Sequence, residues 1–217
     1  VNHQLQANSG SAVEFIAKRL EYRIKDSVIA RVDATSPHIA LASVDPAVDY
    51  NVLEWIGSDI DGFRGTTTPN WSGIIDLNDL AGGAAPDLLI SPATETNATD
   101  ALISILSAGG SAGTSSGIDD AALYFVGSNT NIDLYGYNTV SGTAITNQNS
   151  VMHPIKKNLV ANNILPRDTT AGNNFSGVDV YEYYKLAWTA YAIVMEDYNA
   201  TGTKYEGKNM GDLVLYY

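Results

Sequence analysis

Residues 11–33, SAVEFIAKRLEYRIKDSVIARVD, have the residue spacing of a long amphipathic helix. Apolar residues recur there at intervals of three and four and would form one stripe: Val13, Ile16, Leu20, Ile24 and Val28. Ser11 and Glu14 have the spacing of a capping box at the start. Pro37 should end the element, since a residue before proline avoids the α region.

We therefore expect a helix from Ser11 to Arg31, roughly 30 Å long at 1.5 Å per residue. Its predicted packing face comprises Ile16, Leu20, Ile24 and Val28. The predicted partners of that face come from the apolar runs near the end of the chain: Trp188, Tyr191, Ile193 and Leu215.

The expected helix is basic, whereas the rest of the chain is acidic. The 217 residues carry a formal net charge of −12. Residues 1–31 hold five Lys and Arg against three Asp and Glu, a charge of +2, which leaves −14 for the remainder. This acidity argues against nucleic-acid binding, because phosphates are bound by clustered Lys and Arg. The simplest interpretation of the basic side chains is a solvated face of an ordinary docking helix.

After Pro37 the chain contains short β-type runs between turns, among them YNVLEWIG, AALYFVGS and NIDLYGYN. TDALISILSAGG reads as a short second helix, and HPIKKNLVANNILPRD as an insertion with a helical turn. KLAWTAYAIVMED and GDLVLYY read as a terminal hairpin. The predicted fold class is α+β: a long N-terminal amphipathic helix packed on an antiparallel β-sheet, with irregular loops, forming a single structural domain.

The sequence contains few residues that could perform chemistry. It has no cysteine, and its three histidines lack the spacing of a metal site. SDIDGFRG places Asp59, Asp61 and Gly62 in the spacing that begins many calcium loops. The EF-hand pattern fails, because Phe63 stands where an acidic or amide ligand is needed and Asn70 where a glutamate is needed. We expect no enzyme activity and no cofactor, and a loose calcium site at Asp59 and Asp61 remains an alternative.

Two asparagines lie in extended glycosylation motifs. Asn97 and Asn199 both occur in N-A-T with an acidic residue two positions upstream. This D/E-x-N-x-S/T pattern resembles the acceptor sequence of bacterial oligosaccharyltransferases in the Campylobacter-related lineage. We expect glycosylation at both sites, in exposed loops; the alternative is a chance match in a chain rich in Asn and Thr.

Several segments resemble prepilin-type proteins of Campylobacter-related bacteria: RLEYRIKDSVIAR, LEWIGSDIDGFRG with NWSGIIDLN, and YEYYKLAWTAYAIV followed by LVLYY. The chain resembles the soluble domain of a type IV pilin-like or type II secretion pseudopilin protein, without the apolar N-terminal segment. The prepilin peptidase motif is missing, and the chain has no cysteines for the C-terminal disulfide loop of many members. Major pilin, minor pilin and pseudopilin stay open, with a slight preference for a minor component.

The resemblance implies that residues 1–33 are the C-terminal half of a stem helix and that residues 34–217 are the headpiece. It implies a structural filament subunit whose partners are other pilin or pseudopilin subunits, the inner membrane and the prepilin peptidase. The precursor would face the periplasm and then enter a periplasmic or cell-surface filament. Since the chain begins at Val1 without Met and stops at Tyr217 in an apolar run, we expect a trimmed sequence.

Two other functional classes remain open. A secreted carbohydrate-binding module or adhesin would use exposed Trp and Tyr side chains, and the chain has thirteen tyrosines. An acidic hydrolase would need a pair of carboxylates in a cleft.

Overall fold

The computed structural model describes residues 2–80, 87–107, 117–128, 131–137, 151–167, 175, 178–196, 204–205 and 208–217. For residues 2–8, 204–205 and 208–209 it describes the backbone alone. The chain divides into two compact units: unit 1 is Val1–Gly57 with Thr189–Tyr217, and unit 2 is Ser58–Trp188. The boundary expected between residues 33 and 34 lies inside unit 1.

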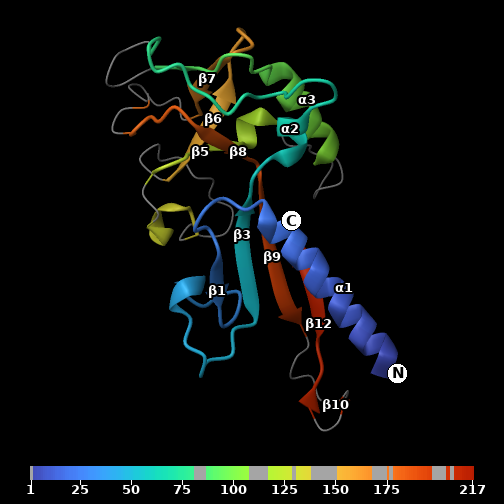
Figure 1. The fold of residues 1–217 in the computed structure, drawn as a ribbon. Helices are drawn as coiled ribbons and strands as arrows, with labels where there is room; N and C mark the ends of the chain where they lie inside the picture. The colour runs from blue at the N-terminus through green and yellow to red at the C-terminus, as the bar shows by residue number, and fades with distance from the viewer. Residues whose placement is uncertain are drawn as a thin grey trace. The chain divides into compact units, whose positions relative to one another are not determined.

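The predicted α+β fold class is wrong. The described residues are mostly β structure: they form two five-stranded antiparallel sheets and only three α-helices (Figure 1). The predicted long helix packed along a sheet is absent: α1 (Asn2–Glu21) ends ten residues before Arg31, and among its described side chains Ile16, Arg19 and Leu20 contact the sheet. Ser11 and Glu14, the predicted cap, lie within this helix.

The residues after α1 form a turn and a strand because they find backbone partners in the sheet. The N–H of Ile24 donates to the carbonyl of Ile56 at 2.8 Å, and the N–H of Ile56 donates to Ser27 Oγ at 3.2 Å. Asp26 has φ 56°, in the left-handed region that an α-helix does not use. The apolar spacing that predicted a continuing helix therefore belongs to buried turn residues and to β1.

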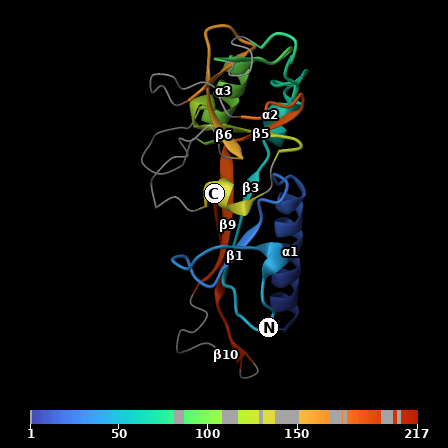
Figure 2. The ribbon, with the colours of Figure 1, turned by 90° about the vertical axis from the view of Figure 1, so that its left-hand side faces the viewer.

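Unit 1 contains a sheet in the order β12-β9-β3-β1-β2. Its strands are β1 (Ile29–Arg31), β2 (Ile39–Ala40), β3 (Val52–Gly57), β9 (Thr189–Glu196) and β12 (Asp212–Tyr216). The other elements of this unit are the 3₁₀ turn η1 (Leu41–Ser43) and a two-stranded pair of β10 (Lys204–Tyr205) and β11 (Lys208–Asn209). Figure 2 shows α1 on one side of β1, β3 and β9.

Unit 2 is inserted between two paired strands of unit 1. β3 and β9 pair in continuous antiparallel register, and the last residue of β3, Gly57, lies opposite the first residue of β9, Thr189. The chain therefore leaves the sheet of unit 1 after Gly57 and rejoins it at the opposite residue, Thr189, so Ser58–Trp188 is a single insertion.

The sheet of unit 2 has the order β4-β7-β6-β5-β8. Its strands are β4 (Leu89–Ile90), β5 (Ala122–Phe125), β6 (Met152–Lys157), β7 (Asn163–Pro166) and β8 (Tyr184–Ala187). Its helices are α2 (Ile60–Arg64), α3 (Thr96–Leu106), and the 3₁₀ turns η3 (Ile118–Asp120) and η4 (Ile132–Leu134). The core residues that are fully or almost fully buried include Ile75, Leu89, Ile103, Leu123, Phe125, Ile155 and Phe175. No helix of the described ranges is long and apolar enough to cross a membrane.

Candidate functional site

The described part of α1 is attached to the sheet of unit 1 by a line of half-buried side chains and by Arg19. Ala12, Ile16 and Leu20, spaced four residues apart, are half-buried, whereas the other described side chains of the helix are exposed. Ile16 and Leu20 pack against a buried cluster of Val28, Trp55 and Ile193. Most of the described helix surface is therefore open to solvent.

The predicted packing face is divided between the helix and the residues that follow it. Ile16 and Leu20 lie on α1, but Ile24 and Val28 follow the helix and are 0% and 8% exposed. They contribute to the core of unit 1 without forming a helical face.

Three of the four predicted partner residues pack in the same cluster as the helix. Tyr191, Ile193 and Leu215 all lie in it. Trp188 lies in unit 2 and packs against the core of that unit.

Arg19 also binds α1 to the sheet, through contacts that were not predicted from the sequence. Its guanidinium carbon lies 5.3 Å from the ring centroid of Phe15 and 5.6 Å from that of Tyr191. Its Nη1 also donates to the hydroxyl of Tyr191 at 3.3 Å. Tyr191 in turn stacks on the buried Trp55, with ring centroids 5.3 Å apart. Phe and Arg four residues apart on a helix are within contact distance, so the F-x-x-x-R spacing could have indicated the contact between Arg19 and Phe15.

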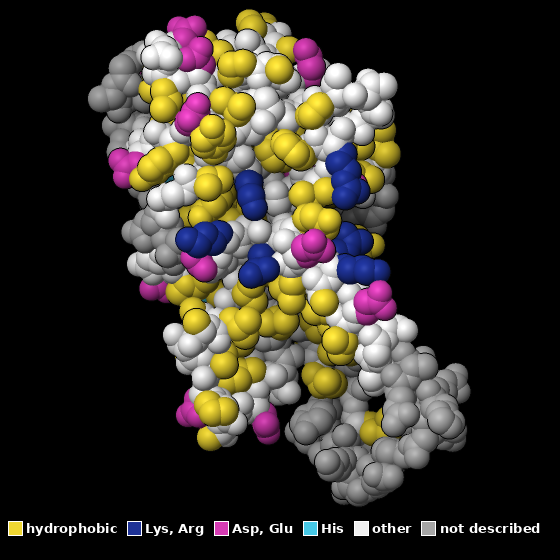
Figure 3. Space-filling view, viewed as in Figure 1, with side chains coloured by type: hydrophobic (Ala, Val, Ile, Leu, Met, Phe, Trp, Pro, Cys, Tyr) yellow, Lys and Arg dark blue, Asp and Glu magenta, His cyan; other side chains and the backbone are white. Residues whose placement is uncertain are grey.

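The exposed surface of α1 and of the turn after it mixes apolar and charged side chains. Val13, Phe15 and Tyr22 are 65%, 45% and 40% exposed. Lys18 and Glu14 form an ion pair of 3.0 Å, but both side chains are largely exposed, so the pair contributes little to stability. Figure 3 shows Lys and Arg side chains among hydrophobic ones on the face of the molecule that carries α1.

The candidate calcium ligand Asp59 is a buried helix cap. It precedes α2, where Oδ1 accepts from the N–H of Gly62 and Oδ2 accepts from the indole N–H of Trp71, both at 3.0 Å. Burial raises the pKa of the Asp59 carboxyl, although the hydrogen bonds from Gly62, Trp71 and Trp188 oppose this shift. Both carboxylate oxygens therefore already have protein donors. Nor do the described ranges contain three or more His, Cys, Asp or Glu grouped so that they could hold a metal.

Gly62 and Gly65 in the same motif have no space for a side chain. A Cβ on Gly62 would overlap Oδ2 of Asp59, and a Cβ on Gly65, which has φ 58°, would overlap the carbonyl oxygen of Thr68. The D-x-D-G spacing is thus explained by a capped short helix and a tight turn.

The two predicted glycosylation sites differ in what the structure describes. Asn97 is exposed but lies in the first turn of α3, where a loop was expected, and Asn199 lies outside the described residues. Thr99, the third residue of the first motif, is fully buried, and its hydroxyl donates to the carbonyl of Glu95 at 3.2 Å. Glycosylation at either site stays a prediction.

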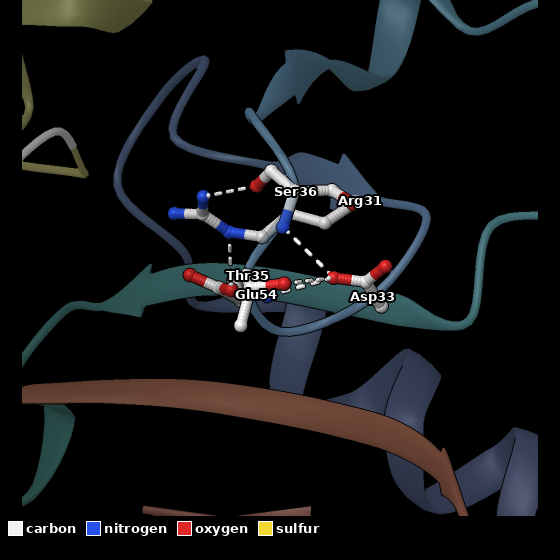
Figure 4. Close-up of polar contacts among 5 residues, drawn as sticks. All are labelled: Arg31, Asp33, Thr35, Ser36 and Glu54. Atoms are coloured by element: carbon white, nitrogen blue, oxygen red, sulfur yellow. Dashed lines mark hydrogen bonds and ion pairs between the residues drawn. The ribbon is translucent and has the colours of Figure 1, made fainter.

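A polar cluster at the turn between β1 and β2 has a structural role (Figure 4). Arg31 Nε donates to Glu54 at 2.8 Å, and its Nη1 donates to the carbonyl of Ser36 at 2.9 Å. Asp33 Oδ1 accepts from the hydroxyl and N–H of Thr35 at 2.7 and 2.8 Å and from the N–H of Ser36 at 2.9 Å. These bonds lower the pKa of Asp33. They fix the turn.

A group of buried and partly buried hydroxyls in unit 2 has no carboxylate or imidazole among its described hydrogen-bond partners. Ser91 Oγ lies 2.7 Å from Thr94 Oγ1, 2.9 Å from Tyr184 Oη and 3.1 Å from Ser72 Oγ. Burial raises the pKa of Tyr184, so its hydroxyl stays protonated at neutral pH. Ser91 Oγ also donates to the carbonyl of Ile74 at 2.8 Å, so hydroxyls and backbone groups meet here, and the geometry favours a hydrogen-bonded core over a nucleophilic site.

No family model, no curated protein and no solved structure matches this chain. Its function is therefore inferred from its own residues.

Proposed function

We propose that this protein is a structural subunit, a minor pilin or pseudopilin, of a type IV pilus or type II secretion filament, and that it assembles through α1. The observation that supports this proposal is the limited attachment of α1, through Ile16, Leu20 and Arg19, which leaves Val13 65% and Phe15 45% exposed. Covering apolar side chains is favourable in water by ~25 cal/mol per Å². A neighbouring helix packed on this surface of α1 would bury these apolar side chains.

The proposal includes the partners that the sequence resemblance implies. Other pilin or pseudopilin subunits would contact the open surface of α1, and the inner membrane would hold the precursor through an apolar segment before Val1. The prepilin peptidase would process that precursor, and the subunit would pass from the periplasmic side of the membrane into the filament. No catalytic role is needed.

The structure gives less support to a carbohydrate-binding module or adhesin. Such a site needs exposed aromatic platforms. Trp55 and Trp71 are 0% and 3% exposed, and Trp188 packs against the core of unit 2. Among the described Trp and Tyr residues, only tyrosines such as Tyr183, which is 55% exposed, are left as platforms. We therefore favour the filament subunit.

Site-specific photo-crosslinking in cells that produce the native full-length protein tests the proposal. A photoreactive amino acid at position 13, on α1, should give a ladder of crosslinked copies of the protein. The matched control is position 159 in unit 2, because Leu159 is 100% exposed but lies outside α1. A probe at position 13 that captures no second copy would overturn the proposal, as would equal ladders from both positions.

A further inference from the structure

Three of the four edges of the two large sheets are short or covered. β2 has only two residues. β4 also has two, and the N–H of Asp76 donates to the carbonyl of Ile90 at 2.9 Å. Along β8, the N–H of Asp59 donates to the carbonyl of Leu186 at 2.7 Å, and the N–H of Tyr184 donates to the carbonyl of Gly73 at 2.9 Å. Short strands and covering loops are the usual protection of sheet edges, because unpaired edge strands recruit other strands.

β12 is the fourth edge: it has five residues, and no other described segment pairs with its open side. Its five residues pair with β9 in unbroken register, from Asp212 opposite Glu196 to Tyr216 opposite Ala192, so no bulge twists the edge away. Residues 212–217, DLVLYY, contain no Pro and no Lys. Within the described residues, no backbone hydrogen bond reaches β12 from a segment other than β9. Leu213 is 47% exposed and Tyr216 is 49% exposed.

We propose that β12 pairs antiparallel with β12 of a second copy of this chain, about a two-fold axis at Val214. The pairing would join the two five-stranded sheets of the copies into one continuous sheet. It is an isologous contact, in which the same strand serves both partners. It is independent of the assembly surface proposed on α1.

The residue pattern of the strand favours one direction of pairing with a second copy. In the antiparallel arrangement Leu213 lies opposite the partner's Leu215, so apolar residues meet. Asp212 lies opposite the partner's Tyr216, whose hydroxyl donates to Glu196 of its own chain, and so does not face a second Asp212. A parallel, in-register pair would place Asp212 opposite the partner's Asp212, and like charges directly opposite each other are destabilising. The strand is thus complementary to itself in one direction only.

Sedimentation of the 217-residue chain over a range of concentrations tests the contact. We expect a weak monomer–dimer equilibrium that is strengthened by salt, because each copy carries a net charge of −12 and the copies repel each other. Leu213→Lys should lower the association constant at least about tenfold without changing the melting temperature, since position 213 is exposed in the monomer. Leu159→Lys, at another exposed leucine, should leave association unchanged.

The outcomes distinguish this contact from assembly through α1. A chain that remains monomeric at every concentration overturns the proposal, and so does a dimer that Leu213→Lys leaves intact. If Val13→Lys abolishes the dimer and Leu213→Lys does not, association belongs to α1 and the edge contact is rejected.

Disulfide trapping tests the direction, because the chain has no cysteine of its own. Residues opposite each other in an antiparallel pair have Cα atoms about 4.5–5.5 Å apart, within the range of a disulfide. An equal mixture of Asp212→Cys and Tyr216→Cys chains should oxidise to a mixed dimer, whereas Asp212→Cys alone should not crosslink. Efficient crosslinking of Asp212→Cys alone would show a parallel pair and contradict the proposed arrangement.

Discussion

At the scale of single residues, the cap formed by Asp59 at the start of α2 requires glycine at position 62. Any side chain there would overlap Oδ2 of Asp59, the same oxygen that accepts from the indole N–H of Trp71. We expect Gly62→Ala to lower the free energy of unfolding by about 1–3 kcal/mol through overpacking. Urea denaturation measures this. The control is Gly10→Ala in α1, where a Cβ meets no atom within 4 Å and should be neutral or stabilising.

Asp100 makes a second residue-scale prediction, on pH dependence. Its Oδ1 accepts from the N–H of Ile118 at 3.0 Å, and its Oδ2 accepts from Lys157. Burial acts to raise the pKa of Asp100, but the hydrogen bonds from Lys157 and Ile118 outweigh it, so the pKa lies below the ordinary 3.8. A lowered folded-state pKa gives stability that is present above the unfolded-state pKa and lost as pH falls through the folded-state value.

Asp100→Asn should therefore destabilise the protein by about 1 kcal/mol at neutral pH, discounted for the partial exposure of the ion pair. The difference from the wild type should shrink as the pH falls below 3.8. Urea unfolding at neutral pH and near ~pH 3 measures both values. A difference that is constant across this range would show that the charge of Asp100 contributes nothing.

At the scale of elements, α1 depends on few contacts. Leu20 is half-buried against the sheet, so Leu20→Ala should lower the free energy of unfolding by about 1–2 kcal/mol, less than for a fully buried leucine. Val13→Ala, at a residue 65% exposed, is the matched control and should change stability little. Thermal denaturation followed by circular dichroism compares the two, and equal effects would contradict this docking of α1.

Local sequence patterns predicted some elements and misread others. The pairing of β9 with β12 and the existence of α3 are confirmed, because each depends on a strong local pattern. The run KLAWTAYAIVMED was read as one strand, but it divides at Trp188 into β8 of unit 2 and β9 of unit 1. The run NIDLYGYN, read as a strand, contains η4, and the segment read as an insertion contains β6 and β7.

The misread elements share a physical cause. Their structure is set by partners distant in the chain, such as Ile56 for Ile24 and Tyr191 for Arg19. Periodicity does not report such contacts. For the same reason, the sequence predicted Ile16 and Leu20 as packing residues but missed Arg19 and the buried cap Asp59.

At the scale of the molecule, the insertion of unit 2 makes a direct prediction. Because Gly57 lies opposite Thr189, the two residues can be joined by a two-residue Asn-Gly turn after deletion of residues 58–188. We expect the remaining unit 1 to fold, with its own buried cluster around Trp55. Circular dichroism and amide hydrogen exchange measure this, and an unfolded product would show that unit 1 depends on unit 2.

The proposal that this chain is a filament subunit assembling through α1 can be tested on the coding sequence upstream of Val1. We expect a Lys or Arg followed by Gly, and then about twenty apolar residues with a glutamate at the fifth position, as in the prepilins that the chain resembles. A cleavable signal peptide that ends near Val1 would contradict it, and would make this a secreted protein without a filament stem.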